Sequence, residues 1–367
     1  MRPFLFFAKK VPKIACYNDV MNAITISLTN FRNIAKKRFT LHNALTIIVG
    51  KNAIGKTNLL ESIYFISRGA GFRESKRDEL IKQSETQCIV EGIFSDKQDD
   101  STYRIVLENS ITIKKAFFVN KIKKRLFDYV KLSAKVIIFS PILMYVIDGQ
   151  PGERREFIDK IIGNIDIEYK KRLQQYEVAL RKRNKLLEKE RNITKLHEEL
   201  PFWDTFLIDQ ARYITKKRDE FTDFLHENKS LDTALFTIHY IKNEMTKERL
   251  ESTFEKQLYA KKTLVGPQRD DFEIEINKGN GFKNVHRFGS RSEQRLALFW
   301  LLLNELKLIE NTFKQKPIIL LDDIFSELDI DNKSLIIRLI TNYQTVITTT
   351  EEHIEDLIHL PHAILRL

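Results

Sequence analysis

The chain has 367 residues, 43% of them hydrophobic and 30% charged, which is typical of a globular protein rather than a disordered or membrane-spanning one. This length predicts two domains, or one large domain with a sizeable insertion. Lysine and arginine number 61 against 50 aspartates and glutamates, a net charge of +11 that favours a polyanionic partner. Only two cysteines are present, which argues against a disulfide framework or a cysteine-rich metal site.

The first 20 residues lack the features of a targeting segment. Their apolar patch is short for a signal peptide and no cleavage site follows it, and no apolar run in the chain reaches the roughly 18 residues of a spanning helix. We therefore expect a cytoplasmic protein with no membrane contact. Because a strand-like run begins at Ile24, we interpret residues 1–20 as an extension, or a mis-set start, outside the folded body.

Strand patterns surround one helix in residues 21–150. Strands are expected between Ile24 and Val49, with turns at Asn30 and Asn43, and a helix is expected over residues 58–67. Alternation of apolar and polar residues predicts antiparallel strands further on, and a short apolar run predicts a buried strand. These five strands are expected at residues 88–90, 103–107, 111–113, 117–119 and 136–139.

From Glu153 the apolar residues recur at helical spacing. Two long helices, the second beginning after Pro201, predict an antiparallel hairpin joined through residues 191–202. The pattern is equally typical of a protruding arm and of an ordinary packed helix pair. We expect a head formed by residues 21–150 and 255–367, with a helical arm, residues 151–254, inserted between them.

Strand patterns return after about residue 255. A strand, a long helix, a buried strand that ends in two aspartates, a helix and a further strand are expected at residues 272–276, 291–310, 317–323, 333–342 and 345–350.

A loop of the sequence Gly50-Lys51-Asn52-Ala53-Ile54-Gly55-Lys56-Thr57 lies between an apolar strand and a helix, where a phosphate-binding loop must lie. Backbone amides of residues 52–57 and the helix N-terminus are expected to donate to phosphate oxygens. Lys56 is expected to reach the β- and γ-phosphates, and the Thr57 hydroxyl to hold Mg²⁺.

The second half of this site is expected at the carboxyl end of the strand around residues 318–321. There, Asp322 would hold Mg²⁺ directly or through water, and Asp323 would orient the attacking water. The alternative interpretation is a pair of solvated or helix-capping aspartates. The ends of the two buried strands carry complementary magnesium-binding groups, a hydroxyl and a carboxylate, and this favours the interpretation as a nucleotide site.

Nine ordered motifs together resemble the SMC-like branch of the ABC-type ATPases, and within it a bacterial family of replication and repair proteins. The resemblance covers nearly all of the chain from Met21 onwards. The motifs lie at residues 30–33, 50–64, 71–73, 139–141, 151–159, 266–271, 290–295, 321–323 and 325–329.

This resemblance implies an α/β fold, with a P-loop ATPase head and the inserted helical arm. It implies that Ser290 and Gln294 belong to a signature loop that caps the γ-phosphate bound to the other subunit of an ATP-dependent homodimer. Residues 326–329 would form the D-loop at the dimer interface. Thr348 to Thr350, after the last strand, would occupy the place of the switch loop, with His353 a surface residue.

The resemblance also implies a function and partners. The protein would hydrolyse ATP with Mg²⁺, bind double-stranded DNA near gaps or stalled forks, and help place the RecA recombinase on single-stranded DNA through RecR, with RecO in the same pathway. Basic groups suited to sequence-independent phosphate contacts lie at residues 36–38, 121–125, 181–183 and 261–262.

Two positions depart from the family pattern. Ser292 stands where the signature usually has glycine, and Ala53 stands where a second loop glycine is common, so the backbone of Ala53 is expected to adopt an ordinary φ.

Three other functions compete with this interpretation. A transporter-type ABC subunit should carry a glutamate after Asp322 and a histidine switch, and a P-loop kinase or nuclease-linked ATPase should lack the signature loop. The motifs leave open an SMC-like DNA clamp with little hydrolysis, because binding and turnover use the same residues.

Overall fold

The protein, analysed as a computed structural model, is described over residues 21–51, 53–73, 77–96, 99–110, 112–190, 192–231, 233–324, 337, 339–350 and 361–367. The segment 1–20, Asn52, the expected D-loop, half of the helix expected at 333–342 and His353 lie outside these residues. The chain divides into two compact units, residues 1–141 with 305–367, and residues 142–304. The assignment of head and arm segments remains a prediction.

The first unit contains a six-stranded antiparallel sheet in the order β2-β1-β4-β5-β6-β7. Its strands alternate buried and more exposed residues, as expected where one face packs on a core. Ile113, at the end of one expected strand, and residues 117–119, the next expected strand, belong to the single strand β6, since Ile113 continues the pairing with β5. The strands are β1 (Asn22–Phe31), β2 (Ile34–Thr40), β4 (Gln87–Ser95), β5 (Asp100–Asn109), β6 (Ile113–Val119) and β7 (Ile122–Lys124).

A second sheet of the first unit is parallel, with the order β15-β3-β14-β13-β8. Its central strands are apolar and β-branched and are buried at every position, as expected for a sheet covered on both faces. The strand β15 was not expected from the sequence, and it follows the strand that the sequence suggested to be last. The strands are β3 (Leu45–Val49), β8 (Val136–Phe139), β13 (Ile318–Asp322), β14 (Thr345–Thr349) and β15 (His362–Arg366).

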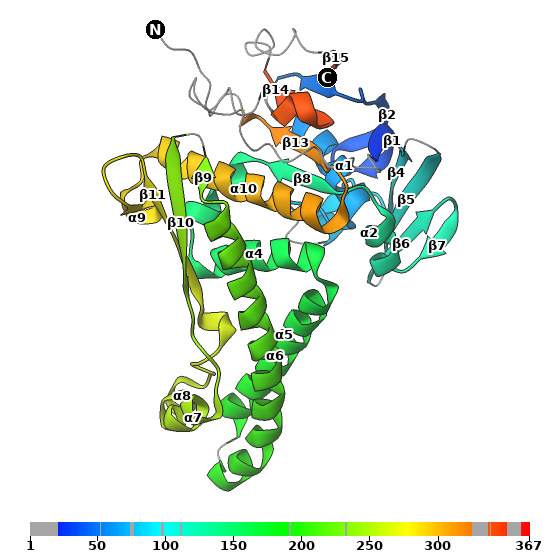
Figure 1. The fold of residues 1–367 in the computed structure, drawn as a ribbon. Coiled ribbons are helices and arrows are strands. Elements are labelled where there is room, and N and C mark those ends of the chain that lie inside the picture. The colour runs from blue at the N-terminus through cyan, green and yellow to red at the C-terminus, as the bar shows by residue number, and fades with distance from the viewer. Residues whose placement is uncertain are drawn as a thin grey trace. The chain divides into compact units, whose positions relative to one another are not determined.

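Helix α1 (Lys56–Arg68) contacts strands of both sheets in the first unit (Figure 1). Nearly all of its residues are buried, including the polar Glu61 and Ser62, as expected for a helix inside a core. Its N-terminus follows the carboxyl end of β3, so burial of the helix fixes the position of the loop between them. Shorter helices of this unit are η1 (Arg77–Leu80) and α2 (Leu126–Leu132), and η2 (Pro141–Met144) begins at its boundary.

The second unit is built on a helical hairpin, α5 (Ile167–Lys189) and α6 (Ile193–Glu227) (Figure 1). Arg172 bonds to Asp209 and Arg183 to Asp204, a pairing order that shows the helices to be antiparallel. The predicted hairpin is thus confirmed. The remaining helices are α3 (Tyr145–Asp148), α4 (Pro151–Ile165), α7 (Lys247–Ser252), α8 (Phe254–Ala260), η3 (Pro267–Arg269) and α9 (Val285–Phe288).

The expected connection of the hairpin, residues 191–202, is wrong. Helix α6 begins at Ile193 and runs through Pro201, with the Asn192 side chain capping its first turn. A proline inside a helix removes one backbone hydrogen bond. Here Leu196 and Leu200 are buried against Leu187 of α5, and this apolar contact offsets the loss.

Four strands complete the second unit in the order β12-β11-β10-β9. The sequence predicted β11 but missed β10, which lies in the segment assigned to the helical arm. Residues of β10 alternate between buried and exposed and pair with β11 along seven positions. The strands are β9 (Ser230–Leu231), β10 (Ala234–Ile241), β11 (Asp271–Asn277) and β12 (Lys283–Asn284).

The predicted apolar helix is α10 (Arg291–Phe313), within which the boundary between the two units falls. In the second unit, the Trp300 ring stacks on Phe236 of β10 with centroids 5.0 Å apart, and its Nε1 donates to the carbonyl of Asn228 over 2.8 Å. Among the helices of the described ranges, none is long and apolar enough to cross a membrane.

Candidate nucleotide-binding site

The glycine-rich loop lies in the first unit, between β3 and α1, as the sequence predicted. Gly55 precedes the helix with φ +113°, a conformation that L side chains rarely adopt, and a Cβ there would lie 3.2 Å from the Asn33 side chain. At Gly50, a Cβ would lie 3.1 Å from Ile54 and 3.3 Å from Leu367. The path of the loop therefore requires glycine at position 55, whereas a side chain at position 50 would crowd Ile54 and Leu367.

Ala53 contradicts the expectation of an ordinary backbone, because its φ is +65°. The loop keeps the left-handed turn at this position even though alanine carries a Cβ, which costs on the order of 1 kcal/mol or more. The alanine in place of the family's glycine therefore carries local backbone strain.

Lys56 opens helix α1 and is 7% exposed. Its ammonium group folds back over the loop, where Nζ donates to the carbonyl of Gly50 over 2.5 Å and to that of Lys51 over 3.4 Å. The positive charge therefore lies within the turn formed by the loop, where a phosphate chain would be bound. Lys51 and Ile54 are exposed on the same loop.

Thr57 and Asp322, the two predicted Mg²⁺ ligands, lie in direct contact. The Thr57 hydroxyl donates to Oδ1 of Asp322 over 2.9 Å, and the hydroxyl of Thr348 on β14 donates to the same oxygen over 2.9 Å. Asp322 is the last residue of β13 and is 7% exposed. A hydroxyl and a carboxylate are hard oxygen donors that suit Mg²⁺, whose other ligands are commonly waters and phosphate oxygens.

Ser140, at the end of β8, is a residue of this site that was not assigned from the sequence. Its hydroxyl is buried and donates to Oδ2 of Asp322 over 3.2 Å. Asp322 thus accepts hydrogen bonds from hydroxyls on three elements, which fix the orientation of its carboxylate. The sequence offered one signal, since Phe139-Ser-Pro141 was among the family motifs.

Asp323 follows the strand with φ +48°, and its backbone N–H donates to Oγ1 of Thr348 over 2.9 Å. Thr348 therefore accepts from Asp323 while it donates to Asp322. Thr348 and Thr349 are fully buried residues of β14, within the strand expected at residues 345–350 and not after it. The β-branched run simply continues the strand to Thr349.

Two family motifs converge on Glu61 of α1, which is fully buried. Arg32 binds its carboxylate through two nitrogens, at 2.9 and 3.0 Å, and Arg73 binds it at 2.8 Å. Arg73 also donates to Asn58 over 2.6 Å, and Asn58 donates to Asn33 over 2.7 Å. Removing a charged partner of a buried carboxylate strongly destabilises a protein. These contacts therefore hold α1 in place against the loops that carry Arg32 and Arg73.

In the second unit, the predicted signature segment forms the N-terminus of α10. The Ser290 N–H donates to Oε2 of Glu293 over 2.8 Å, and the Glu293 N–H lies 3.3 Å from the Ser290 hydroxyl, which is a capping box. Ser290 is exposed, whereas Gln294 is 7% exposed and its amide donates to the carbonyl of Val285. The structure therefore presents the backbone and hydroxyl at the helix end, and holds the Gln294 side chain inward.

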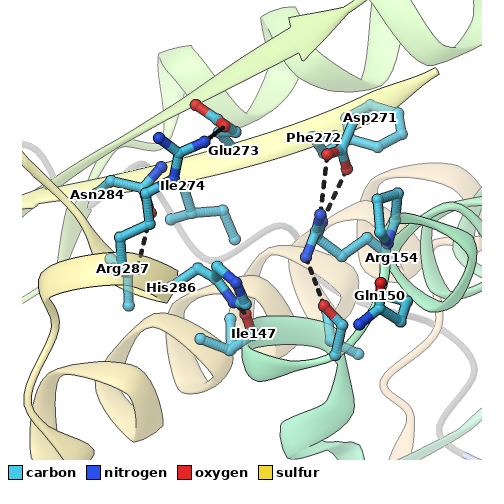
Figure 2. A pocket seen from close by; sticks show the side chains of 14 residues that line it. Ile147, Gln150, Arg154, Asp271, Phe272, Glu273, Ile274, Asn284, His286 and Arg287 are labelled. Atoms are coloured by element: carbon cyan, nitrogen blue, oxygen red, sulfur yellow. Dashed lines mark hydrogen bonds and ion pairs between the residues drawn. The ribbon is translucent and has the colours of Figure 1, made fainter.

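A cavity of about 310 Å³ lies in the same unit, between β11, α9 and the start of α4 (Figure 2). Arg154 makes two bonds of 2.8 Å to Asp271 across it and donates to the carbonyl of Gly149, while Arg287 lies 3.3 Å from Glu273. Each arginine is matched by a carboxylate. The motifs at 151–159 and 266–271 thus meet in a charge-balanced pocket.

Comparisons with known proteins agree with this architecture. A family model described as the RecF/RecN/SMC N terminal domain matches residues 23–360. The DNA replication and repair protein RecF of Clostridium botulinum, strain Langeland, is 32% identical over 359 residues, covering 93% of this chain and 96% of the relative. The chain belongs to the RecF family. RecF of C. botulinum strain Okra is 33% identical over 341 residues, covering 89% and 91%.

Solved RecF structures share the fold. One, described as the recombination mediator protein RecF with ATPrS in the RecFOR pathway, overlaps with a TM-score of 0.81 at 30% identity and covers 91% of this chain and 94% of that one. A second, described as RecF with ATP, has a TM-score of 0.78 at the same identity and coverage. The α/β fold of a RecF-type and SMC-type head is thereby confirmed.

Proposed function

We propose that the chain is an ATP-dependent DNA-binding protein of recombinational repair and replication, which dimerises on ATP and hydrolyses it weakly with Mg²⁺. The observation that carries the proposal is the contact of Thr57 with Asp322, beside Lys56, at the carboxyl ends of parallel strands. Ligands of open α/β sheets bind at this edge. The likeness to RecF structures described with ATP supports a nucleotide as the ligand.

In this proposal the phosphate chain binds the amides of residues 52–57 and the N-terminus of α1. Lys56 exchanges its contact with the Gly50 carbonyl for the β- and γ-phosphates. Thr57 and Asp322 hold Mg²⁺, which supplies positive charge against the phosphate oxygens. Asp323 orients the attacking water, and the hydroxyls of Ser140 and Thr348 hold the neighbouring carboxylate in place.

The proposal also implies that the active form is a homodimer. The exposed Ser290 and the N-terminus of α10 offer N–H donors and partial positive charge, which suit the γ-phosphate bound to a second copy. Phe288, two residues earlier, is 71% exposed, as suits a surface that another chain covers. Loss of the γ-phosphate removes contacts that only the dimer makes, so hydrolysis shifts the population toward monomers.

The DNA and protein partners are proposed from family membership and charge. Relatives named as DNA replication and repair proteins, and a net charge of +11, support binding to duplex DNA. We place the chain near gaps or stalled forks, where it helps load RecA on single-stranded DNA through RecR, with RecO. A cytoplasmic location fits this role and remains a prediction.

The deciding experiment is a measurement of molar mass by light scattering, with and without ATP, Mg²⁺ and duplex DNA, at two salt concentrations. We expect monomers without nucleotide, dimers with ATP, and a DNA complex that weakens as salt rises. Ser290→Arg should keep nucleotide binding but remain monomeric. Absence of ATP-driven dimers in the wild type contradicts the proposal, whereas dimers without phosphate release favour a DNA clamp with little hydrolysis.

A further inference from the structure

The outward face of α5 carries a continuous line of exposed side chains. They recur at steps of three, four and seven residues, which places them on one side of a helix. All are exposed, and none is acidic. We call this set the α5 stripe: Lys171, Gln174, Gln175, Val178, Arg181, Lys182, Lys185 and Lys189.

The stripe follows from an uneven distribution of charge over the hairpin. Helix α5 contains eight lysines and arginines against three glutamates, whereas α6 contains five against eight aspartates and glutamates. The two helices pack side by side (Figure 1). The flank of the hairpin formed by α5 therefore carries the basic surplus. This surplus of positive charge identifies one surface of the hairpin, whereas the net charge of the whole chain does not say which surface is basic.

Ion pairs elsewhere in the second unit make the contrast clear. Lys195 lies 2.9 Å from Glu190, and Lys242 lies 2.7 Å from Asp219. Within the described part of the chain, by contrast, no carboxylate lies within 4.0 Å of Arg181, Lys185 or Lys189. Arg181, Lys185 and Lys189 thus form no close ion pair with a described residue, although Glu177 lies near enough to Arg181 for the two charges to interact.

Arg183 shows why the sequence alone did not define this surface. It belongs to the basic group 181–183, yet it is 1% exposed and bonds to Asp204, Gln257 and Thr263. Arg181 and Lys182 face outwards instead. Helical geometry therefore divides one basic run into an internal structural residue and two members of the stripe.

The exposed face of the antiparallel sheet in the first unit is a weaker candidate. Strand register places Arg104 opposite Glu91, and Lys114 opposite Glu108, so acidic residues interrupt its basic ones. On α5 the exposed Glu177 and Glu188 border the stripe, and none of the eight residues of the stripe is acidic.

We infer that the α5 stripe binds the phosphate backbone of duplex DNA, an inference that rests on the proposed function. From Lys171 to Lys189 the stripe spans eighteen residues, about 27 Å at 1.5 Å per residue, and a turn of duplex is about 34 Å. Lysine and arginine neutralise phosphates, and glutamine amides donate to them, without reading bases. The contact is therefore independent of sequence and sensitive to salt.

The test compares two triple variants of the full chain by fluorescence anisotropy on labelled duplex DNA, with ATP and Mg²⁺, over a series of salt concentrations. The stripe variant carries Arg181→Gln, Lys185→Gln and Lys189→Gln. The matched control carries Lys195→Gln, Lys216→Gln and Lys247→Gln, which removes the same charge from exposed lysines that lie beside carboxylates.

We expect the stripe variant to bind DNA at least tenfold more weakly near 0.1 M salt, with a salt slope lower by about 2 to 3 because up to three phosphate contacts are lost. The control should stay close to the wild type, and both variants should still form ATP-driven dimers. Equal binding by the stripe variant and the wild type overturns the inference, even if the stripe then proves to bind an acidic protein. A wild type that binds no duplex DNA overturns the proposed function as well.

Discussion

The Thr57 hydroxyl donates to Oδ1 of Asp322 over 2.9 Å, although 265 positions separate the two residues in the chain. Thr57 lies in the first turn of the helix after the glycine-rich loop, and Asp322 ends a buried strand of the parallel sheet. Their contact brings the glycine-rich loop and a buried carboxylate into one site.

Lys56→Ala should weaken ATP binding by about 10- to 100-fold, because it removes charge-assisted hydrogen bonds worth about 1.5–3 kcal/mol. ATP-driven dimers should disappear at ordinary ATP concentrations. Isothermal calorimetry and light scattering measure the two effects. Lys131→Ala, at an exposed lysine of the same unit, serves as the control, and normal dimers of the Lys56 variant would contradict the assignment of the loop.

Asp323→Asn should slow phosphate release by about a hundredfold or more, the usual contribution of a positioned base. ATP-driven dimerisation should persist, because the loop and the residues around Asp322 are unchanged. Phosphate release and molar mass are measured on the same sample, with the exposed Asp128→Asn as control. Unchanged hydrolysis would show that another group orients the water.

Ser140→Ala should raise the Mg²⁺ concentration needed for half-maximal ATP binding by about tenfold, since a hydrogen bond to a charged group is worth about 1.5–3 kcal/mol. The measurement is a magnesium titration of fluorescent ATP binding, which does not depend on turnover. Ser133→Ala is the matched control, because Ser133 is equally buried but donates to the Tyr129 carbonyl. If both variants shift alike, Ser140 acts only in folding.

Ala53→Gly should stabilise the protein by about 0.5–1 kcal/mol, because glycine adopts φ +65° without the strain of a Cβ. Urea unfolding of the nucleotide-free protein measures the change. Ala35→Gly, at an exposed strand position without positive φ, should instead lower stability by about 0.5–1 kcal/mol. A loss of stability in the Ala53 variant would indicate that the loop has no strain there.

Cys88 is 1% exposed on β4, and burial raises the pKa of its thiol to about 12. The folded state therefore holds a proton that the unfolded chain releases near pH 8.5. The contribution of this thiol to the free energy of unfolding is therefore fully present below that pH and is lost as the pH rises toward 12. In a Cys16→Ser background, replacing Cys88 by alanine should remove this part of the alkaline loss.

The same background allows a direct check by thiol labelling at pH 8. We expect labelling of native Cys88 to be at least a hundredfold slower than in urea, because the thiolate is the reactive form and burial disfavours it. Rapid labelling of the native protein would show that the thiol is accessible.

Local patterns in the sequence determined much of the fold. Glycines at positions 50 and 55, an apolar strand before them and a helix after them were sufficient to locate the loop. Helical periodicity identified α5 and α10, and the aspartates after the run 318–321 marked the end of β13. Each of these inferences depends on residues within one or two turns, or within one strand, of each other.

The tertiary structure decided the rest. Ser140 and Thr348 donate hydrogen bonds to Asp322, Ala53 has a positive φ within the loop, and Pro201 lies inside α6 because Leu196 and Leu200 are buried against Leu187. Strand β10 depends on its pairing with β11, and the exposure of Arg181 beside the burial of Arg183 depends on what packs against α5. These features depend on contacts with residues elsewhere in the fold. Neither the spacing nor the composition of the sequence identifies those residues.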